Sequence, residues 1–251
     1  MSFPSYDPSA DGYVVTLVTT ILAGISLIMY STYLILLPPK AKYIDLNKVP
    51  AGHDDVGASL LGSHVVVTGG SSGIGLSVAK ILASKPCIKT VTIMSRSKRK
   101  LEAAKKEIEA VKDLCSSVNT VALDLAVSDE EGFEVVEKAV SDTVARFGPP
   151  LMLFNCAGAA RAKRFGDMDF DLFPRLASVN FFGTAAATRA FYPHMVKHGK
   201  GGRIVITSSA AGQIGLYGYT SYSASKFALR GFAESLAMEV SFASRQLSSN
   251  V

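Results

Sequence analysis

Cysteine is scarce in this sequence and is not arranged for cross-linking. The three cysteines, Cys87, Cys115 and Cys156, lie far apart and form no C-x-x-C pair. Their odd number and their spacing argue against a disulfide framework or a zinc ribbon, and they fit a reducing compartment. We interpret them as core or surface thiols.

The sequence also lacks the signatures of nucleic-acid and metal binding. Its formal net charge of +5 is mild, and no basic stripe is interleaved with aromatic residues. Such a charge suits an anionic cofactor or a membrane surface and gives no reason to expect a nucleic-acid partner. His194 and His198 have i, i+4 spacing, but no Glu follows the first and no third ligand is evident, so we expect no metal site.

One long stretch lacks both charge and proline. Residues 14–37, "VVTLVTTILAGISLIMYSTYLILL", are apolar enough and long enough to span a bilayer as one helix. A cleaved signal peptide is the alternative, but acidic residues precede this run and it exceeds the usual apolar core of a signal. Lys40 and Lys42 follow the run and no basic residue precedes it, which predicts a short luminal segment at 1–13 and a cytosolic body. The absence of any N-x-Ser/Thr sequon agrees with that orientation.

A regular alternation of strands and helices follows the linker predicted at 38–60. We expect strands in 64–70, 90–95, 120–125, 151–158 and 202–209, and a helix at 73–84 with Ile74, Val78, Ile81 and Leu82 on one side. Leu101, Ala104, Ile108 and Val111 mark a second helix. Alternating strands and helices predict an α/β fold in 61–251, with a doubly wound parallel sheet covered on both faces.

A glycine-rich turn, "TGGSSGIG" at 68–75, connects the first strand to the first helix. Gly69, Gly73 and Gly75 would let the backbone approach a pyrophosphate, with Ser71 and Ser72 beside it and free N–H groups at the helix N-terminus. An ordinary strand-to-helix turn is the alternative reading. A Walker-type loop is excluded because no Lys-Ser/Thr pair ends the motif.

The end of the second strand bears on the choice of cofactor. It reads "MSRSKRK", and a basic residue at this point accommodates the 2′-phosphate of NADPH, whereas an acidic one holds the free ribose of NADH. We assign Arg96 to the phosphate. Lys98, Arg99 and Lys100 are interpreted as the solvated first turn of a helix.

Tyrosine and lysine stand one helical turn apart in "YSASK". Tyr222 and Lys226 therefore share a helix face, and the ammonium would stabilise a phenolate and bring the tyrosine pKa toward neutral pH. Ser209, at the end of the last strand, can donate a hydrogen bond to a substrate carbonyl. Asn180, in the helical stretch "RLASVNFFGT", would hold a water that connects the lysine to solvent.

Together these motifs resemble the short-chain dehydrogenase/reductase family over about residues 62–240. The resemblance implies a Rossmann-type fold and hydride transfer between a nicotinamide and a carbonyl or carbinol carbon. It also implies that Asp124 contacts the adenine, that Asn155 in "NCAG" lies at the cofactor, and that Tyr222 and Lys226 touch the cofactor as well as acting with Asn180 and Ser209 in catalysis.

A narrower resemblance concerns the branch of the family that reduces a long-chain sphingoid ketone with NADPH. It rests on the glycine turn and on residues 208–240, and it implies a single-pass protein of the endoplasmic reticulum membrane. Membrane-anchored steroid or retinoid reductases are the alternative within the family.

The end of the sequence departs from the family pattern. After "ESLAMEV" the family continues through a further strand and a Pro-Gly loop, whereas "SFASRQLSSNV" has neither, so we expect a domain that is incomplete at its C-terminal end. This leaves open a non-catalytic chain that binds a full-length reductase. The resemblance implies association, including homo-oligomers, through the helices that carry Asn180 and Tyr222.

Overall fold

The structure is a computed structural model that describes residues 62–197 and 202–248. The expected luminal segment, membrane span and linker, at 1–13, 14–37 and 38–60, lie outside these residues. No helix in the described part of the chain is both long and apolar enough to cross a bilayer.

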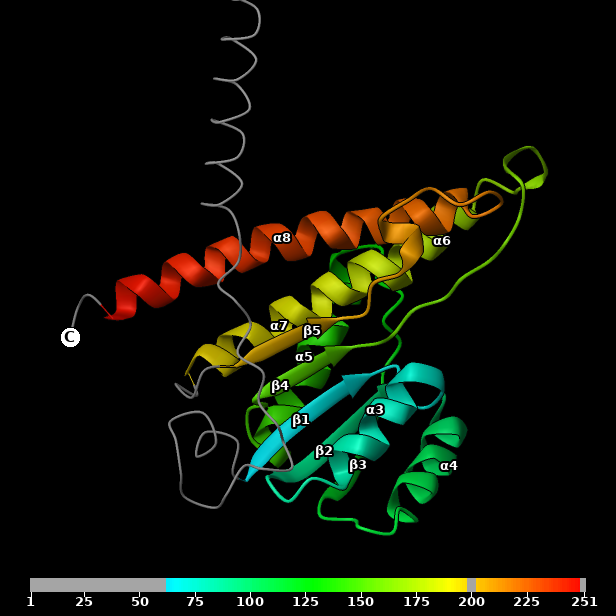
Figure 1. Cartoon of the computed structure of the whole chain (residues 1–251). Helices are drawn as coiled ribbons and strands as arrows, with labels where there is room; N and C mark the ends of the chain where they lie inside the picture. Colours follow the sequence, from blue (N-terminus) through cyan, green and yellow to red (C-terminus); the bar gives the residue numbers. More distant parts are fainter. Residues whose placement is uncertain (1–61, 198–201, 249–251) are drawn as a thin grey trace, which may run out of the picture. The chain divides into compact units, whose positions relative to one another are not determined.

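A five-stranded, wholly parallel sheet forms the centre of the fold (Figure 1). Its strands are β1 (Ser63–Thr68), β2 (Ile88–Ser95), β3 (Ser117–Ala122), β4 (Met152–Asn155) and β5 (Arg203–Ile206). Their spatial order is β3-β2-β1-β4-β5. Strands β2 and β3 are therefore added on one side of β1, and β4 and β5 on its other side. This order confirms the predicted parallel α/β fold, and it places the carboxyl ends of β1 and β4 side by side at the switch point where such folds bind ligands.

Within the described residues, six α-helices and three short helical segments lie between the strands or follow the last one. The α-helices are α3 (Gly73–Ala83), α4 (Lys98–Glu109), α5 (Glu130–Phe147), α6 (Leu172–Ala177), α7 (Gly183–Lys197) and α8 (Thr220–Ser248). The short segments are η1 (Phe165–Asp167), the π-helix η2 (Ser178–Phe182) and η3 (Ala210–Gly212). Helices α3 and α4 cover one face of the sheet, and α5 and α7 cover the other (Figure 1).

The third strand differs from its prediction. It begins at Ser117 and ends at Ala122, whereas the sequence predicted 120–125. Beyond the strand, Leu123 and Leu125 are buried while Asp124 is exposed. That alternation imitates a half-buried strand, although these residues form an irregular connection to α5.

The apolar side predicted for α3 is buried only in part, at Leu82. Ile74 and Ile81 are 64% and 58% exposed, and the residues that face the sheet are Gly75, Ala79, Leu82 and Ala83. Gly75 lets α3 begin close against the glycine turn, because a Cβ on it would stand only 2.5 Å from the Gly69 carbonyl oxygen. In α4 the prediction is confirmed for Leu101, Ala104 and Ile108, whereas Val111 lies beyond the helix end.

The main core fills the space between the sheet and helices α5 and α7. Val66 and Leu153 contribute from the two central strands, Val136 and Val140 from α5, and Phe191 from α7, all at most 1% exposed. Burial of such aliphatic and aromatic side chains stabilises the fold by roughly 1.5–3 kcal/mol each. This core fixes the central strands, whose carboxyl ends carry the site.

His64, in β1, is a buried polar residue on the central strand. Its Nδ1 lies 2.7 Å from the Gly148 carbonyl oxygen, to which it donates, and its Nε2 lies 2.8 Å from Thr92 Oγ1 in β2. Burial lowers the pKa of the imidazole below its ordinary value, although the bond to Gly148 opposes the shift. The folded state therefore favours the neutral imidazole of His64.

We expect His64 to make the fold sensitive to mild acid. The unfolded chain binds a proton near pH 6.5, whereas the folded chain resists it, so the free energy of unfolding is highest above that pH and falls as the pH drops. One such group contributes a slope of at most about 1.4 kcal/mol per pH unit. Urea unfolding followed by circular dichroism between pH 7.5 and 5 measures it. The His64→Gln protein should be less stable at pH 7.5, but its free energy of unfolding should lack the part of the pH dependence that comes from His64. Equal slopes of the free energy of unfolding against pH in both proteins would contradict the assignment.

Candidate active site

The glycine turn after β1 is held tightly against the end of β4. Gly69 and Gly73 have positive φ angles of 67° and 54°, which L side chains rarely adopt. A Cβ on Gly69 would lie 2.7 Å from the Ala157 backbone nitrogen, while nothing lies within 4 Å of one on Gly73. The turn is therefore closed toward β4 and open at Gly73, where α3 begins.

The N-terminus of α3 presents backbone donors at this opening. Ser72 is the N-cap residue, is exposed, and makes no side-chain capping bond. The N–H groups in the first turn of a helix have no partner within the helix, and the helix dipole favours an anion beside them. The Ser71 hydroxyl donates to Ser95 Oγ at 2.8 Å and ties the turn to β2. The turn, Ser72 and the open side of Gly73 fit the pyrophosphate of a dinucleotide.

Thr68, which the sequence analysis missed, joins the ends of β1 and β4. Its Oγ1 accepts hydrogen bonds from the backbone N–H groups of Cys156 and Ala157, both at 3.2 Å. This hydroxyl fixes the separation of the glycine turn and the loop after β4. The available signal was a hydroxyl residue that ends a β-branched run directly before glycines.

Arg96 and Asp124 follow β2 and β3 at the same edge of the sheet. Arg96 is exposed, and no carboxylate pairs with it within the described ranges. Asp124 is exposed too, and its Oδ1 accepts from the Ala126 N–H at 3.1 Å, which is the turn role of an aspartate after a strand. Both side chains face solvent where a cofactor would lie, and their assigned contacts stay predictions.

Asn155 is placed differently from the other predicted cofactor residues. Its side chain is 2% exposed and donates through Nδ2 to Thr188 Oγ1 in α7 at 3.0 Å. Its Oδ1 is buried and has no hydrogen-bond partner among the described residues. Asn155 thus joins β4 to α7, and its contact with a cofactor stays a prediction.

Lys226 is buried on the same helix face as Tyr222. The lysine is 5% exposed, and its Nζ donates to the Thr207 carbonyl oxygen at 2.9 Å and lies 5.9 Å from the centroid of the Tyr222 ring. Burial lowers the pKa of Lys226 below its ordinary value, with a smaller opposing effect of Cys156. Burial also raises the pKa of the Cys156 thiol, which agrees with a packed strand-end residue. The geometry places the Lys226 amino group on the same side of α8 as the Tyr222 ring, as the spacing predicted.

Asn180 lies in the π-helix η2 and is wholly buried. Its Oδ1 accepts from the Ala159 N–H at 2.8 Å, and its Nδ2 donates to the Ala159 carbonyl and to Ser225 Oγ, both at 2.9 Å. The Ser225 hydroxyl in turn donates to the Tyr222 carbonyl oxygen at 2.7 Å. Both amide hydrogens are therefore used, and the side chain connects the loop after β4 to α8, while the water contact expected from the sequence stays a prediction.

Ser209 heads η3, directly after β5. Its Oγ accepts from the Ala211 N–H at 3.2 Å, which leaves the hydroxyl hydrogen free to donate. Segment η3 packs closely on α8, because a Cβ on Gly212 would lie 3.0 Å from the Lys226 carbonyl oxygen. Thr207 and Ser225, which sequence reasoning missed, anchor α8 to β5 and η2, and they bring Asn180, Ser209, Tyr222 and Lys226 to one region.

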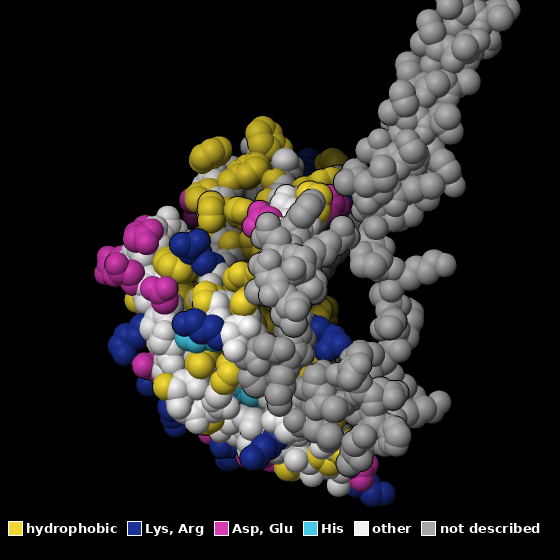
Figure 2. Space-filling view, turned by 90° about the vertical axis from the view of Figure 1, so that its left-hand side faces the viewer, with side chains coloured by type: hydrophobic (Ala, Val, Ile, Leu, Met, Phe, Trp, Pro, Cys, Tyr) yellow, Lys and Arg dark blue, Asp and Glu magenta, His cyan; other side chains and the backbone are white. Residues whose placement is uncertain are grey.

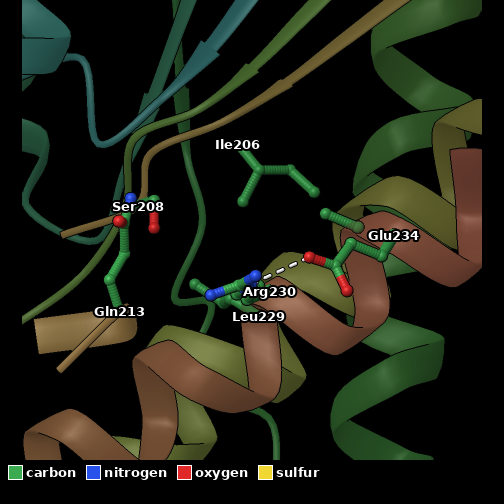
Figure 3. Close-up of a pocket in the computed structure, with 7 residues that line it drawn as sticks. Ile206, Ser208, Gln213, Leu229, Arg230 and Glu234 are labelled. Atoms are coloured by element: carbon green, nitrogen blue, oxygen red, sulfur yellow. Dashed lines mark hydrogen bonds and ion pairs between the residues drawn. The ribbon is translucent and has the colours of Figure 1, made fainter. Parts of the chain in front are cut away.

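A pocket of about 340 Å³ lies between the end of β5 and α8 (Figure 3). Its lining comprises Ile206, Ser208, Gln213, Leu229, Arg230, Ala233 and Glu234. The ion pair between Arg230 and Glu234, at 2.8 Å, forms part of its wall. None of the four predicted catalytic residues lines it, so we do not assign the substrate to this pocket.

Comparisons with known proteins agree with this geometry. The model of the family described as "short chain dehydrogenase" matches residues 63–244. The chain is 44% identical over 184 residues to the 3-ketodihydrosphingosine reductase of Bos taurus, and 43% identical over 186 residues to the 3-dehydrosphinganine reductase of Danio rerio. Each alignment covers 72% of this chain and 53% of the relative, so the chain spans about half the length of these relatives.

A solved structure has the same fold. A metagenomic short-chain oxidoreductase in complex with NADP superposes with a TM-score of 0.63 at 31% identity, over 72% of this chain and 78% of that chain. The family match covers the glycine turn, η2, the end of β5 and the Tyr222–Lys226 helix together. The chain therefore belongs to the short-chain dehydrogenase family.

Proposed function

We propose that the protein is an NADPH-dependent reductase of a long-chain sphingoid ketone, converting 3-ketodihydrosphingosine to dihydrosphingosine. The buried Lys226 ammonium, 5.9 Å from the Tyr222 ring, carries the proposal. The reaction type is supported by the family, and the substrate by relatives named 3-ketodihydrosphingosine reductase at 42–44% identity.

The side chains divide the reduction of a ketone among them. Tyr222 delivers the proton to the carbonyl oxygen, since Lys226 lowers the free energy of the phenolate that remains. The free hydrogen of Ser209 donates to the same oxygen and stabilises the charge that develops on it. Asn180 keeps the loop after β4 and the catalytic helix in register. A bound NADPH would supply the hydride.

Cofactor binding is assigned to the carboxyl edge of β1, β2 and β3. The turn with Gly69, Gly73 and Gly75, together with Ser72, would hold the pyrophosphate at the N-terminus of α3. Asp124 would face the adenine, and Arg96, exposed and without a carboxylate partner in the described part of the chain, would pair with the 2′-phosphate.

The preference for NADPH over NADH should depend on Arg96. We expect Arg96→Asp to weaken NADPH binding about 10- to 100-fold, because a charge-assisted contact to phosphate is lost and a repulsive charge replaces it. Binding of NADH should change little or improve. Fluorescence titration of both cofactors measures the ratio. Lys100→Asp, a charge reversal in the first turn of α4, is the matched control, and an unchanged ratio in Arg96→Asp would discard the assignment.

We further propose a place and a partner for the protein. The apolar run at 14–37 and the lipid character of the substrate support a single-pass protein of the endoplasmic reticulum membrane with its catalytic body in the cytosol. Phe182 on η2 and Phe227 on α8 are 49% and 42% exposed, and they support a homo-oligomer through these helices.

The test is NADPH oxidation by the purified chain in detergent micelles with 3-ketodihydrosphingosine. Turnover that requires Tyr222 is the expected result. Turnover with steroid or retinoid ketones and none with the sphingoid ketone would favour an anchored reductase of those lipids. A folded chain that captures a longer reductase of the family but does not bind NADPH would overturn the catalytic proposal in favour of a partner-binding chain.

A further inference from the structure

Five exposed apolar side chains stand at the carboxyl edge of the sheet, beside the candidate site. Phe165 and Phe170 precede α6 and are 68% and 80% exposed. Ile214, Leu216 and Tyr217 precede α8 and are 60%, 38% and 87% exposed. We call these five residues the apolar rim. The mechanism uses none of them, and exposure of so many large apolar groups in two neighbouring loops marks a contact surface.

The two loops of the rim are joined and supported. The Lys163 N–H donates to the Gly218 carbonyl oxygen at 2.8 Å, so the loop after β4 and the loop before α8 run side by side (Figure 1). The Phe173 ring supports the first loop, with ring centroids 6.4 Å from Phe165 and 5.6 Å from Phe170. The apolar rim thus consists of protruding side chains on two loops that are held by a backbone hydrogen bond and by the Phe173 ring.

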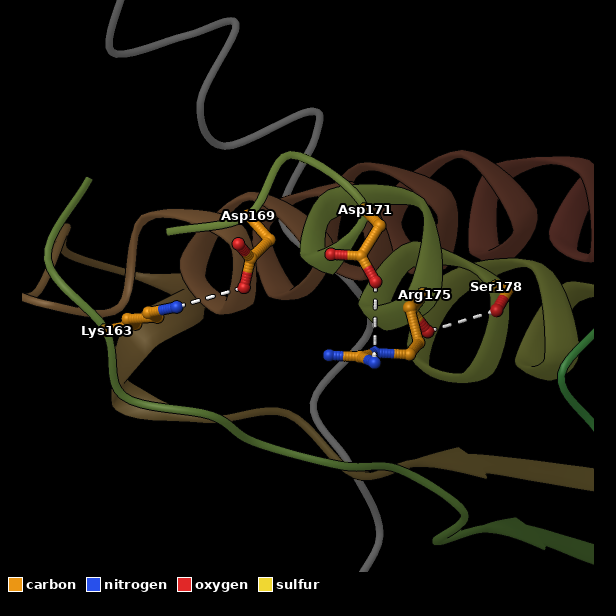
Figure 4. Close-up of polar contacts among 5 residues, drawn as sticks. All are labelled: Lys163, Asp169, Asp171, Arg175 and Ser178. Carbon is orange, nitrogen blue, oxygen red and sulfur yellow. Dashed lines mark hydrogen bonds and ion pairs between the residues drawn. The ribbon is translucent and has the colours of Figure 1, made fainter. Parts of the chain in front are cut away.

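The charged side chains of residues 161–175, the segment that carries Phe165 and Phe170, are largely paired with one another, as Figure 4 shows for Lys163 with Asp169 and Arg175 with Asp171. Lys163 pairs with Asp169 at 3.0 Å, Arg164 with Asp167 at 2.6 Å, and Arg175 with Asp171 at 3.5 Å. Lys163 holds the pKa of the Asp169 carboxyl below its usual range, so the pair stays charged. Arg161 is exposed and has no acidic partner in the described part of the chain, which leaves this segment with one surplus positive charge.

We propose that the apolar rim inserts into a lipid bilayer surface, so that the body contacts the membrane independently of the run at 14–37. Protruding aromatic and aliphatic tips suit the acyl boundary of a bilayer, whereas a protein partner would need a matching recess. The surplus cation suits anionic headgroups. Figure 2, which views the body from the left-hand side of Figure 1 and so from the side opposite these loops, shows further hydrophobic side chains at the top of the described body, at the height of α8.

This contact would deliver a bilayer-resident ketone directly to the loops that border Ser209 and Tyr222. That purpose rests on the proposed function, but the contact itself does not. A membrane-facing rim can exist in a chain that reduces another substrate or none.

The absence of tryptophan from the sequence allows a direct test. Phe170→Trp and Tyr217→Trp are each made in the full chain and reconstituted into phosphatidylcholine–phosphatidylserine vesicles, without NADPH or ketone. We expect blue-shifted emission and at least twofold quenching when the acyl chains are brominated. Ile81→Trp, at a position that is 58% exposed on α3, is the control and should be quenched by acrylamide instead.

Two outcomes would overturn the proposal. If the rim tryptophans are quenched by acrylamide and not by brominated lipid, as expected for the Ile81→Trp control, the apolar rim is exposed to water and does not enter the bilayer. Rim tryptophans protected from acrylamide but not quenched by brominated lipid would show a protein cover, such as a second copy. Because the assay contains no substrate, a negative turnover experiment and a negative quenching experiment are independent of each other.

Discussion

Tyr222→Phe should lower kcat for the sphingoid ketone by about 10²- to 10⁴-fold, the usual contribution of a positioned general acid. The change removes only the phenol oxygen, and the ring can keep its place 5.9 Å from Lys226 Nζ and 5.9 Å from the Tyr219 ring. The dissociation constant for NADPH should rise by no more than about tenfold, the effect of one lost neutral hydrogen bond to the cofactor. Steady-state kinetics and a cofactor titration on the same preparation separate the two quantities.

Tyr219→Phe is the matched control for this experiment. It makes the same chemical change three residues earlier, in a ring packed against Tyr222, and should retain kcat within about twofold. Equal losses in the two variants would show that the tyrosine pair acts through packing. A Tyr222→Phe protein with undiminished turnover would remove the proton-transfer role altogether.

Gly69→Ala should weaken NADPH binding by two orders of magnitude or more. A non-glycine residue at φ 67° costs about 1–2 kcal/mol, and the new Cβ would also stand 2.7 Å from the Ala157 backbone nitrogen. Backbone atoms cannot rotate away as a side chain does, so the turn must move off β4. Fluorescence titration with NADPH measures the loss, and a thermal melt reports the change in stability.

Two further glycines make this result interpretable. Gly166→Ala introduces a methyl group with no atom within 4 Å and no positive φ, and it should leave binding unchanged. Gly73→Ala also has open space around the new methyl group, which would stand at the start of α3 where the pyrophosphate is assigned, and its φ of 54° strains the backbone as at Gly69 without the clash against Ala157. If Gly69→Ala does not fold, reduced binding by a folded Gly73→Ala protein tests the same assignment. Unchanged binding in both would contradict it.

The sequence predicted the order of strands and helices well, but it failed where burial depends on small residues. On α3 the large apolar residues Ile74 and Ile81 were placed on one side with Leu82, yet Gly75 and Ala79 face the sheet. Hydrophobicity ranks these small residues low, although they alone permit close approach of a helix to strands. Which face of a helix is buried depends on how closely the helix packs against the sheet. The spacing of apolar residues along the sequence carries no information about that distance.

The site shows the same division between local and distant information. The four-residue spacing of Tyr222 and Lys226 is local, and the structure places the pair as the spacing indicates. The bonds of Asn180 to Ala159 and Ser225 span 21 and 45 positions, so no local pattern reveals that its amide hydrogens are used. Thr68 escaped notice for the same reason, since its partners lie 88 and 89 positions away.

The π-helix η2 lies within one continuous helical segment formed by α6, η2 and α7, and it rotates the helix faces that follow it relative to those that precede it. A π-turn contains an additional residue, and each residue of an α-helix advances by about 100°, so the faces before and after η2 are offset. This offset lets Asn180 bond Ser225 in α8 while Ala187 and Phe191, further along the same helical segment, pack into the main core. Deleting one residue between 178 and 182 would convert the turn to regular α-helix. Asn180 and Phe191 could then no longer both face their present partners, so the length of this turn is itself a determinant of the site.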